Sequence, residues 1–496
     1  MKKSLIVLSF LLAAVLNMSA KNQPNIIWIM AEDMSIDLEC YGMKAVKTPN
    51  LNKLAEQGVR FDECFVTNPI CSPSRSAMMV GTHQVRINAG NHRSNRNVPL
   101  DEQFKPFTYH LRKAGYTCIL GHHSVMKNGR KIDCNFKTEA LGEWDGKSKF
   151  GLFDKYDNFE AQDQPFYAHI QLVVTHRGDW WNEIREKSAH PVNPDDVELP
   201  DYLADHPVIR LDWAKYLDQV EYMDGEVGMI VKELEDKGLA DNTIIVFIGD
   251  NGRCNIKGKG YLNDPGLHIP FIAYNPKGLP GKKVRKDVVS ATDITATVLD
   301  WAGVEIPDYM TGMPVFDKKF KREYSYGARD LWDEVEEKMR SITDGEWKYI
   351  RNDKTDLAWD AHQAYLEFYR PAVHIMRELN KEGKLTKTQQ FFFNSTKPKE
   401  ELYNLKNDPQ ELVNLANNPE YAKQLSKMRK ATEEFDSEYV PVNNIYEPIA
   451  PVSVDVLEWL KTEKPDAYEQ MLAGVEIGFK KYTTEYKKAM KAKKKK

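Results

Sequence analysis

The residues with the clearest chemical potential lie in the segment Cys-Ser-Pro-Ser-Arg at residues 71–75, which an apolar stretch separates from Gly81. Ser72 suits a helix cap, the proline after it suits a first helical position, and Gly81 suits a C-terminal stop. We therefore expect a short helix with Cys71 just ahead of its start. Free amide groups and the helix dipole favour an anion there, and Arg75 adds positive charge. This arrangement indicates chemistry on a negatively charged substrate.

Polar residues that bind metals or transfer protons follow four apolar runs. They are Glu32 and Asp33 after residues 24–30, His122 and His123 after 116–120, His176 after 166–174, and Asp250 and Asn251 after 243–248. Each run is typical of a buried strand. Because parallel strands of an open α/β sheet bring their carboxyl ends to one ligand-binding edge, we expect these side chains to converge. Carboxylate and amide oxygens suit Ca²⁺ or Mg²⁺.

Helical patterns alternate with these strands, at residues 49–55, 108–114 and 211–237, and a further strand at 59–66 leads into the cysteine motif. This alternation predicts an α/β sandwich with a large, mostly parallel central sheet. Beyond about residue 314, segments 338–343 and 347–351 favour a hairpin, and 401–405 favours another strand. We expect an α/β domain over residues 21–320. A smaller C-terminal subdomain should follow over residues 321–496, with an antiparallel sheet, helices and a basic tail.

The N-terminus predicts export. Two lysines precede an apolar run at residues 5–16, and small residues continue to Ala20. The run is too short to span a bilayer, so residues 1–20 are interpreted as a signal peptide of a periplasmic or secreted protein without membrane insertion. The net charge of −4 in 496 residues gives no reason to expect nucleic acid. The basic run at residues 491–496 is interpreted as a solvated tail.

An even number of cysteines, six, in an exported chain favours disulfides, but their spacing resembles no compact disulfide framework. If Cys71 is reserved for chemistry, at least one of the others is unpaired. We predict no particular pairing.

The motif Cys-x-Pro-x-Arg resembles that of the type I, formylglycine-dependent sulfatases. Other segments of the chain are similar to the same family: Gly-Asp-Asn-Gly at 249–252, Lys-Gly-Tyr from Lys259 to Pro270, and the C-terminal signature at 401–416. The resemblance implies an alkaline phosphatase-like fold and, together with the signal peptide, an exported bacterial carbohydrate sulfatase.

By this resemblance, Cys71 is oxidised by a formylglycine-generating maturation enzyme, and the hydrated aldehyde attacks sulfur. The implied ligands of one divalent cation, Ca²⁺ by analogy, are Glu32, Asp33, Asp250, Asn251 and the modified Cys71. Arg75 and Lys259 would neutralise the sulfate oxygens. His176 would protonate the departing alkoxide. The second hydroxyl of the hydrate would then release sulfate.

The chain departs from the family pattern at three places. Glu32-Asp33 replaces the usual Asp-Asp, and the usual Lys-x-His after Gly121 is His122-His123-Ser124. His123 or Lys127 could then act as the base, and the sequence does not decide between them. A purely structural role for His122 and His123 also stays open. The family's arginine at the end of the Lys259 segment is His268.

Substrate-contacting residues are suggested by position. His92 follows the motif helix, and Gly-Ala-Arg-Asp at 327–330 resembles a pocket segment of glycan sulfatases, so Arg329 and Asp330 could bond sugar hydroxyls. His122 and His268 complete this set. The sugar, the sulfated position and the oligomeric state cannot be predicted.

Three functions fit these observations. The first is hydrolysis of a sulfate ester on a glycosaminoglycan, mucin-type or other sulfated glycan. A phosphodiesterase or phosphonate hydrolase of the same fold is the second. The third is a catalytically silent protein that binds sulfated glycans, suggested by the missing lysine after Gly121.

Overall fold

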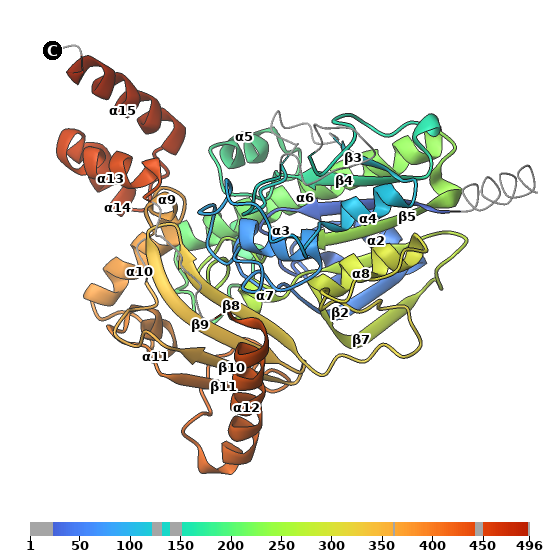
Figure 1. Ribbon diagram of the computed structural model, residues 1–496. Helices are drawn as coiled ribbons and strands as arrows, with labels where there is room; N and C mark the ends of the chain where they lie inside the picture. The colour runs from blue at the N-terminus through green and yellow to red at the C-terminus, as the bar shows by residue number, and fades with distance from the viewer. Residues whose placement is uncertain (1–22, 122–130, 139–150, 361–362, 442–449, 495–496) are drawn as a thin grey trace, which may run out of the picture.

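A computed structural model describes residues 23–121, 131–138, 151–360, 363–441 and 450–494 of the chain (Figure 1). The predicted signal peptide at residues 1–20 lies outside the described residues, as do His122, His123 and Lys127.

The central sheet has seven strands in the order β3-β4-β1-β5-β6-β2-β7, and all but β6 run in one direction. Their bounds are β1 Asn25–Ala31, β2 Val59–Phe65, β3 Thr117–Gly121, β4 Phe166–Leu172, β5 Thr243–Gly249, β6 Phe271–Tyr274 and β7 Lys283–Ser290. The mostly parallel sheet predicted from the alternation of strands and helices is confirmed.

Helices cover both faces of this sheet (Figure 1). One group packs together as α3 Cys71–Val80, α4 Phe107–Lys113 and α8 Ala291–Trp301; the other surrounds α6 Pro207–Asp236 and includes α2 Pro49–Gln57, α5 Trp180–Lys187 and α10 Pro371–Lys381. The short α7 Asp264–Leu267 lies just before β6 in the chain.

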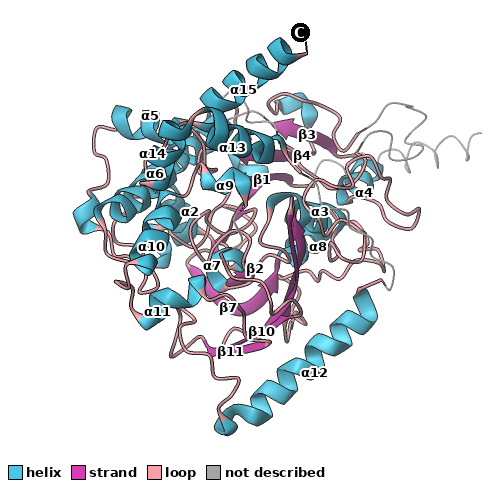
Figure 2. Cartoon of the chain, turned by 90° about the vertical axis from the view of Figure 1, so that its left-hand side faces the viewer, coloured by secondary structure: helices cyan, strands magenta, loops and turns pink. Residues whose placement is uncertain are grey.

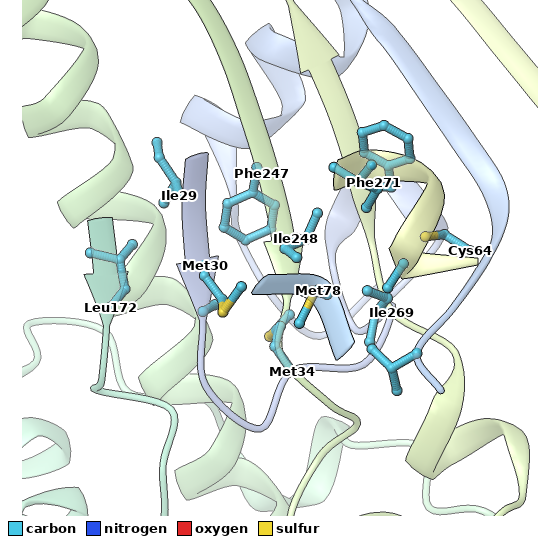
Figure 3. Packing of buried hydrophobic residues seen from close by; sticks show 14 of the residues in the cluster. Ile29, Met30, Met34, Cys64, Met78, Leu172, Phe247, Ile248, Ile269 and Phe271 are labelled. Carbon is cyan, nitrogen blue, oxygen red and sulfur yellow. The ribbon is translucent and has the colours of Figure 1, made fainter. Parts of the chain in front are cut away.

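The inner strands are buried along their whole length because both of their faces are covered. Every residue of β1, β4 and β5 is buried. Figure 3 shows Ile29 and Met30 of β1, Phe247 and Ile248 of β5, and Leu172 at the end of β4 in one packed cluster. Continuous burial of this kind is expected for parallel strands between two helical layers.

A second sheet is antiparallel, with the order β11-β10-β9-β8. Its strands are β8 Ser325–Trp332, β9 Val335–Thr343, β10 Trp347–Asn352 and β11 Glu400–Asn404. The helix α12 Ala422–Tyr439 packs against β9 and β10 (Figure 2). The predicted hairpin and the predicted strand at 401–405 are confirmed. The domain boundary near residue 320 stays a prediction.

The remaining described helices are α9 Ala364–Glu367, α11 Lys387–Gln390, α13 Val452–Glu463, α14 Pro465–Leu472 and α15 Phe479–Lys493. Residues of α13, α14 and α15 form a separate apolar cluster with Phe368 and Tyr369. None of the described helices is both long and apolar enough to cross a membrane. All six cysteines lie in described segments, and all are free.

Candidate active site

Strand order brings the predicted polar residues to one edge of the sheet. β1 lies between β4 and β5 and runs parallel to both, so the residues after the three strands are neighbours. Glu32 and Asp33 follow β1, Asp250 and Asn251 follow β5, and the turn after β4 leads to His176. The predicted convergence at the carboxyl edge is confirmed for these residues.

The motif helix begins two residues earlier than predicted. Cys71 is the first residue of α3, and Ile70 is its N-cap, with an extended conformation and no side-chain capping bond. The predicted cap, Ser72, is wrong because this residue already lies inside the helix, where its hydroxyl accepts the Arg93 amide at 3.0 Å. Gly81 does end the helix, in the left-handed conformation at φ 73°.

Asp33 lies at the centre of the site. Its backbone is left-handed at φ 48°, and its amide donates to Asp250 Oδ1 at 2.9 Å. Its Oδ1 accepts Lys259 Nζ at 2.6 Å and Asn251 Nδ2 at 3.0 Å. Cys71 Sγ lies 3.6 Å from the same oxygen. Strained backbone of this kind is common where a side chain must be aimed at a functional centre.

Two cations near Cys71 are Arg75, on the same helix, and Lys259, from the segment after β5. Arg75 contacts Asp250 Oδ2 through Nε at 2.9 Å and through Nη2 at 2.8 Å. Lys259 Nζ lies 3.0 Å from Cys71 Sγ. Both side chains are buried. Each cation therefore lies beside the position from which the residue-71 side chain would contact an anion.

Lys131 is a site residue that sequence reasoning missed. Its ammonium lies 2.9 Å from Glu32 Oε2 and 3.2 Å from Asp133 Oδ2. The signal for it is the missing lysine after Gly121, which points to a later lysine but does not distinguish Lys127 from Lys131. Spacing along a loop does not reveal which lysine returns to the sheet edge.

His176 is half-buried beside the carboxylates. Its Nε2 lies 3.8 Å from Glu32 Oε2, and its Nδ1 lies 2.9 Å from the Arg177 carbonyl oxygen. Since Nδ1 must donate to a carbonyl, Nε2 is the nitrogen directed at the site. Burial lowers the pKa of His176 to about 4, and the Lys259 ammonium adds to this effect while Asp33 opposes it.

Burial raises the pKa values of the acids at this edge, and pairing with cations lowers them. Burial raises the pKa of Asp33 and Glu32, but nearby groups together outweigh it and hold both pKa values below their ordinary range. Lys259 contributes most to this lowering at Asp33, and Lys131 contributes most at Glu32. The pKa of Asp250 is raised because burial, Asp33 and Glu32 outweigh Arg75. Burial and Asp250 raise the pKa of the Cys71 thiol.

Several buried oxygens at this edge have no hydrogen-bond partner among the described residues: Glu32 Oε1, Asp33 Oδ2 and Asn251 Oδ1. Ligand atoms of Asp33, Cys71 and Asp250 lie within 4.8 Å of one another. Buried acceptors without donors are costly unless something else satisfies them. The donor set is hard oxygen, so it fits a divalent cation such as Ca²⁺.

The predicted substrate residues are dispersed. Asp330 pairs with Arg340 at 2.5 Å, and His92 pairs with Asp333 at 2.8 Å. Arg329 is 1% exposed and donates to the Gly260 carbonyl instead. The structure does not bring these residues into one group with Cys71.

His268 also lies apart from the cysteine. Its Nε2 bonds the Asp62 carbonyl at 2.6 Å, and it lines a cavity of about 620 Å³ together with Glu63, Asp264 and Lys286. Of the residues around Cys71, none lines this cavity.

Comparison with known proteins places this geometry in context. The family model described as Sulfatase matches residues 24–304. An ulvan-active sulfatase of Formosa agariphila is 31% identical over 462 residues, covering 83% of this chain and 74% of that one.

Solved structures agree on the fold. A 2-O GAG sulfatase superposes with a TM-score of 0.61 at 18% identity, covering 87% of this chain and 96% of the other. A phosphonate monoester hydrolase of Agrobacterium radiobacter gives 0.59 at 17% identity, covering 84% and 96%. The alkaline phosphatase-like fold implied by the motifs is therefore confirmed.

Proposed function

Because the chain belongs to the sulfatase family, we propose that it hydrolyses a sulfate ester on a carbohydrate and releases inorganic sulfate. The observation that carries the proposal is the position of Cys71. Its sulfur lies at the start of α3, 3.0 Å from the Lys259 ammonium and 3.6 Å from Asp33. A nucleophile at residue 71 would therefore meet its anionic substrate beside fixed positive charge.

Cys71 is the precursor of the nucleophile in this proposal. Its buried thiol has a raised pKa, so little thiolate forms at neutral pH, and an unmodified cysteine would be a poor nucleophile here. Formylglycine, made from Cys71 by a maturation enzyme, would supply one hydroxyl of its hydrate for attack on sulfur and a second for release of sulfate.

Glu32, Asp33, Asp250 and Asn251 would hold the cation, whose role is to polarise the sulfate and to acidify the hydrate. Their unpartnered buried oxygens support this assignment. The charges of the protein itself come close to balance: Arg75, Lys131 and Lys259 face Glu32, Asp33 and Asp250. A bound divalent cation would leave the site positive and receptive to an anion.

The remaining chemistry falls to three side chains. Arg75 and Lys259 would hold the sulfate oxygens, where charge must be stabilised through the transfer. His176 Nε2 would give a proton to the departing alkoxide. The imidazole is neutral near pH 7 because burial lowers its pKa to about 4, and a bound sulfate ester would favour its protonated form.

Mass spectrometry of the Cys71 peptide tests the proposal when the protein is produced together with a maturation enzyme. We expect an aldehyde in place of the thiol and turnover of sulfated saccharides. Cys71→Ala should fold but lose turnover. An unmodified thiol in an active sample contradicts the mechanism.

A substrate panel tests the reaction class. Defined sulfated saccharides and aryl sulfates should be hydrolysed in preference to phosphodiesters and phosphonate monoesters. A preference for phosphonates contradicts the proposal and favours a hydrolase like the structural neighbour of that activity. Tight binding of a sulfated saccharide by fully modified protein without turnover indicates a silent binding protein.

A further inference from the structure

The peptide of Lys259 and Gly260 is held by two arginines from the C-terminal part of the chain. Arg370 Nη2 donates to the Lys259 carbonyl at 3.0 Å, and Arg329 Nη1 donates to the Gly260 carbonyl at 2.6 Å. Arg370 lies just before α10, and Arg329 lies on β8. Both side chains are buried. Two consecutive carbonyls next to the Lys259 side chain are therefore fixed by charged donors.

The same peptide is fixed on its other side to the cysteine. The Gly260 amide donates to the Pro69 carbonyl at 2.9 Å, two residues before Cys71. The Lys259 amide donates to the Arg253 carbonyl at 2.8 Å. The backbone under Lys259 is thus bonded through both its amides and both its carbonyls.

Trp332 packs near both arginines. The guanidinium carbons of Arg329 and Arg370 lie 5.6 and 5.8 Å from its ring centroid. Gly260 has φ 93°, and a Cβ at this position would lie 2.0 Å from the Trp332 ring. Glycine is required here because the backbone is left-handed and touches the indole. The close packing leaves the peptide no room to shift.

The burial of these arginines is expensive for the fold. Neither forms an ion pair within 4.0 Å of a carboxylate among the described residues. Arg329 Nε and Nη2 and Arg370 Nε also lack hydrogen-bond partners there. A buried charge with so few partners is unfavourable for stability. The presence of two such arginines is explained if the Lys259 and Gly260 carbonyls must be held in place for function as well as for stability.

We propose that Arg370 and Arg329 are positioning residues that fix the Lys259 backbone so that its ammonium stays beside Cys71. The proposal rests on the proposed function only in assigning sulfate binding to Lys259. It gives β8 and the segment before α10 an indirect part in the reaction, because they act through Lys259 in the N-terminal part of the chain.

A double-mutant cycle tests this inference. On a small sulfated substrate, Arg370→Met should lower kcat/KM by about 10- to 10²-fold, since a misplacement of about 1 Å can cost up to 10²-fold. In a Lys259→Met background the same substitution should cost less than about twofold, because its target is gone. The same fold-loss in both backgrounds overturns the proposal.

Two further variants separate positioning from folding. Arg370→Lys retains a cationic donor and should recover part of the lost kcat/KM. Arg377 is the matched control: it lies on α10, pairs with Asp360 and Glu367 at 2.7 Å, and makes no contact with Lys259. Arg377→Met should lower the melting temperature, while its kcat/KM should stay near that of the protein without the substitution. Equal kinetic losses in the Arg370→Met and Arg377→Met variants contradict a positioning role.

A crystal structure of Arg370→Met provides a readout that does not depend on activity. We expect the Lys259 ammonium to leave hydrogen-bond distance of residue 71. An ammonium that keeps its contact with residue 71 overturns the proposal. If the unsubstituted protein hydrolyses no sulfate ester, the proposed function fails, and the crystal structure still decides the inference.

Discussion

At the scale of single residues, the site is organised around pairing rather than around isolated reactive groups. Each acid at the sheet edge has a cationic partner: Lys131 for Glu32, Lys259 for Asp33 and Arg75 for Asp250. Buried carboxylates require such partners to stay ionised. Ionised carboxylates are also what a divalent cation needs as ligands. The three cations therefore prepare the acids for metal binding while remaining available to an anion.

Lys131 provides the first prediction at this scale. Lys131→Met should leave Glu32 without its closest cation and remove a positive charge near the nucleophile. We expect kcat/KM for a sulfate ester to fall by about 10²-fold, as for loss of one charge-stabilising group in an active site. Steady-state kinetics on an aryl sulfate measure this directly.

The matched control for Lys131 is Lys137, an exposed lysine six residues later in the same segment. Lys137→Met should change kcat/KM by less than about twofold, since exposed charges in solution are screened. Comparable losses in the two variants would show that net charge, not the position of Lys131, matters.

The convergence of polar residues at the sheet edge is predictable from the sequence because parallel strands bring their carboxyl ends to the same edge. A polar residue that follows a buried parallel strand lies at the carboxyl edge of the sheet. Asp33, Asp250 and His176 all lie at this edge. Lys131 lies at the same edge, but nine residues outside the described ranges separate it from β3, and spacing along the sequence alone does not fix where its side chain lies.

At the scale of elements, the docking of α12 depends on a neutral histidine. His83, just beyond α3, packs edge-on against Phe435 of α12, with ring centroids 4.6 Å apart. Burial lowers the pKa of His83 to about 3, and the nearby Arg322 and Arg86 add to this. The neutral imidazole acts here as an aromatic packing element.

His83 predicts an acid-sensitive interface. Its pKa is lower in the folded than in the unfolded state, where it is about 6.5, so the unfolded chain takes up the proton first. Stability should then fall as the pH drops from about 6.5 towards 3. His83→Phe should reduce the slope by up to about 1.4 kcal/mol per pH unit.

Urea unfolding at several pH values between 4 and 7.5 measures this slope. The buried His169, whose pKa is also about 3, is retained in both proteins, so some acid sensitivity should remain in the variant. Parallel stability profiles for the two proteins would exclude His83 as a source of the effect.

Element boundaries were predicted well where burial is continuous and poorly elsewhere. The strand predicted at 243–248 is β5, Thr243–Gly249. The strands β6 and β7 were not predicted. β6 is only four residues long, and β7 begins with exposed charged residues that conceal its pattern. Residues 327–330 of β8 resemble a pocket segment in the sequence, but Arg329 bonds the Gly260 carbonyl and Asp330 pairs with Arg340.

At the scale of the whole molecule, the two sheets share one core. Met339 of β9, Ile350 of β10 and Met376 of α10 belong to the same apolar cluster as the central strands. Polar contacts also cross this boundary, including Lys257 Nζ to the Gln410 carbonyl at 2.7 Å. The change in sequence pattern beyond about residue 314 therefore predicts a second sheet. It does not reveal that the two sheets are packed together.

This shared core predicts a single unfolding transition, which a buried ion pair can test. Lys348 of β10 is fully buried and lies 2.7 Å from Asp264 of α7, near the segment that carries Lys259. Lys348→Met leaves the half-buried Asp264 without this partner, which should cost about 1–3 kcal/mol. Calorimetry should show one transition at a lower temperature. Lys354→Met, at an exposed pair with Glu336, should change stability by less than about 1 kcal/mol. Two separate transitions, with only one of them shifted by Lys348→Met, would mean that the sheets unfold independently.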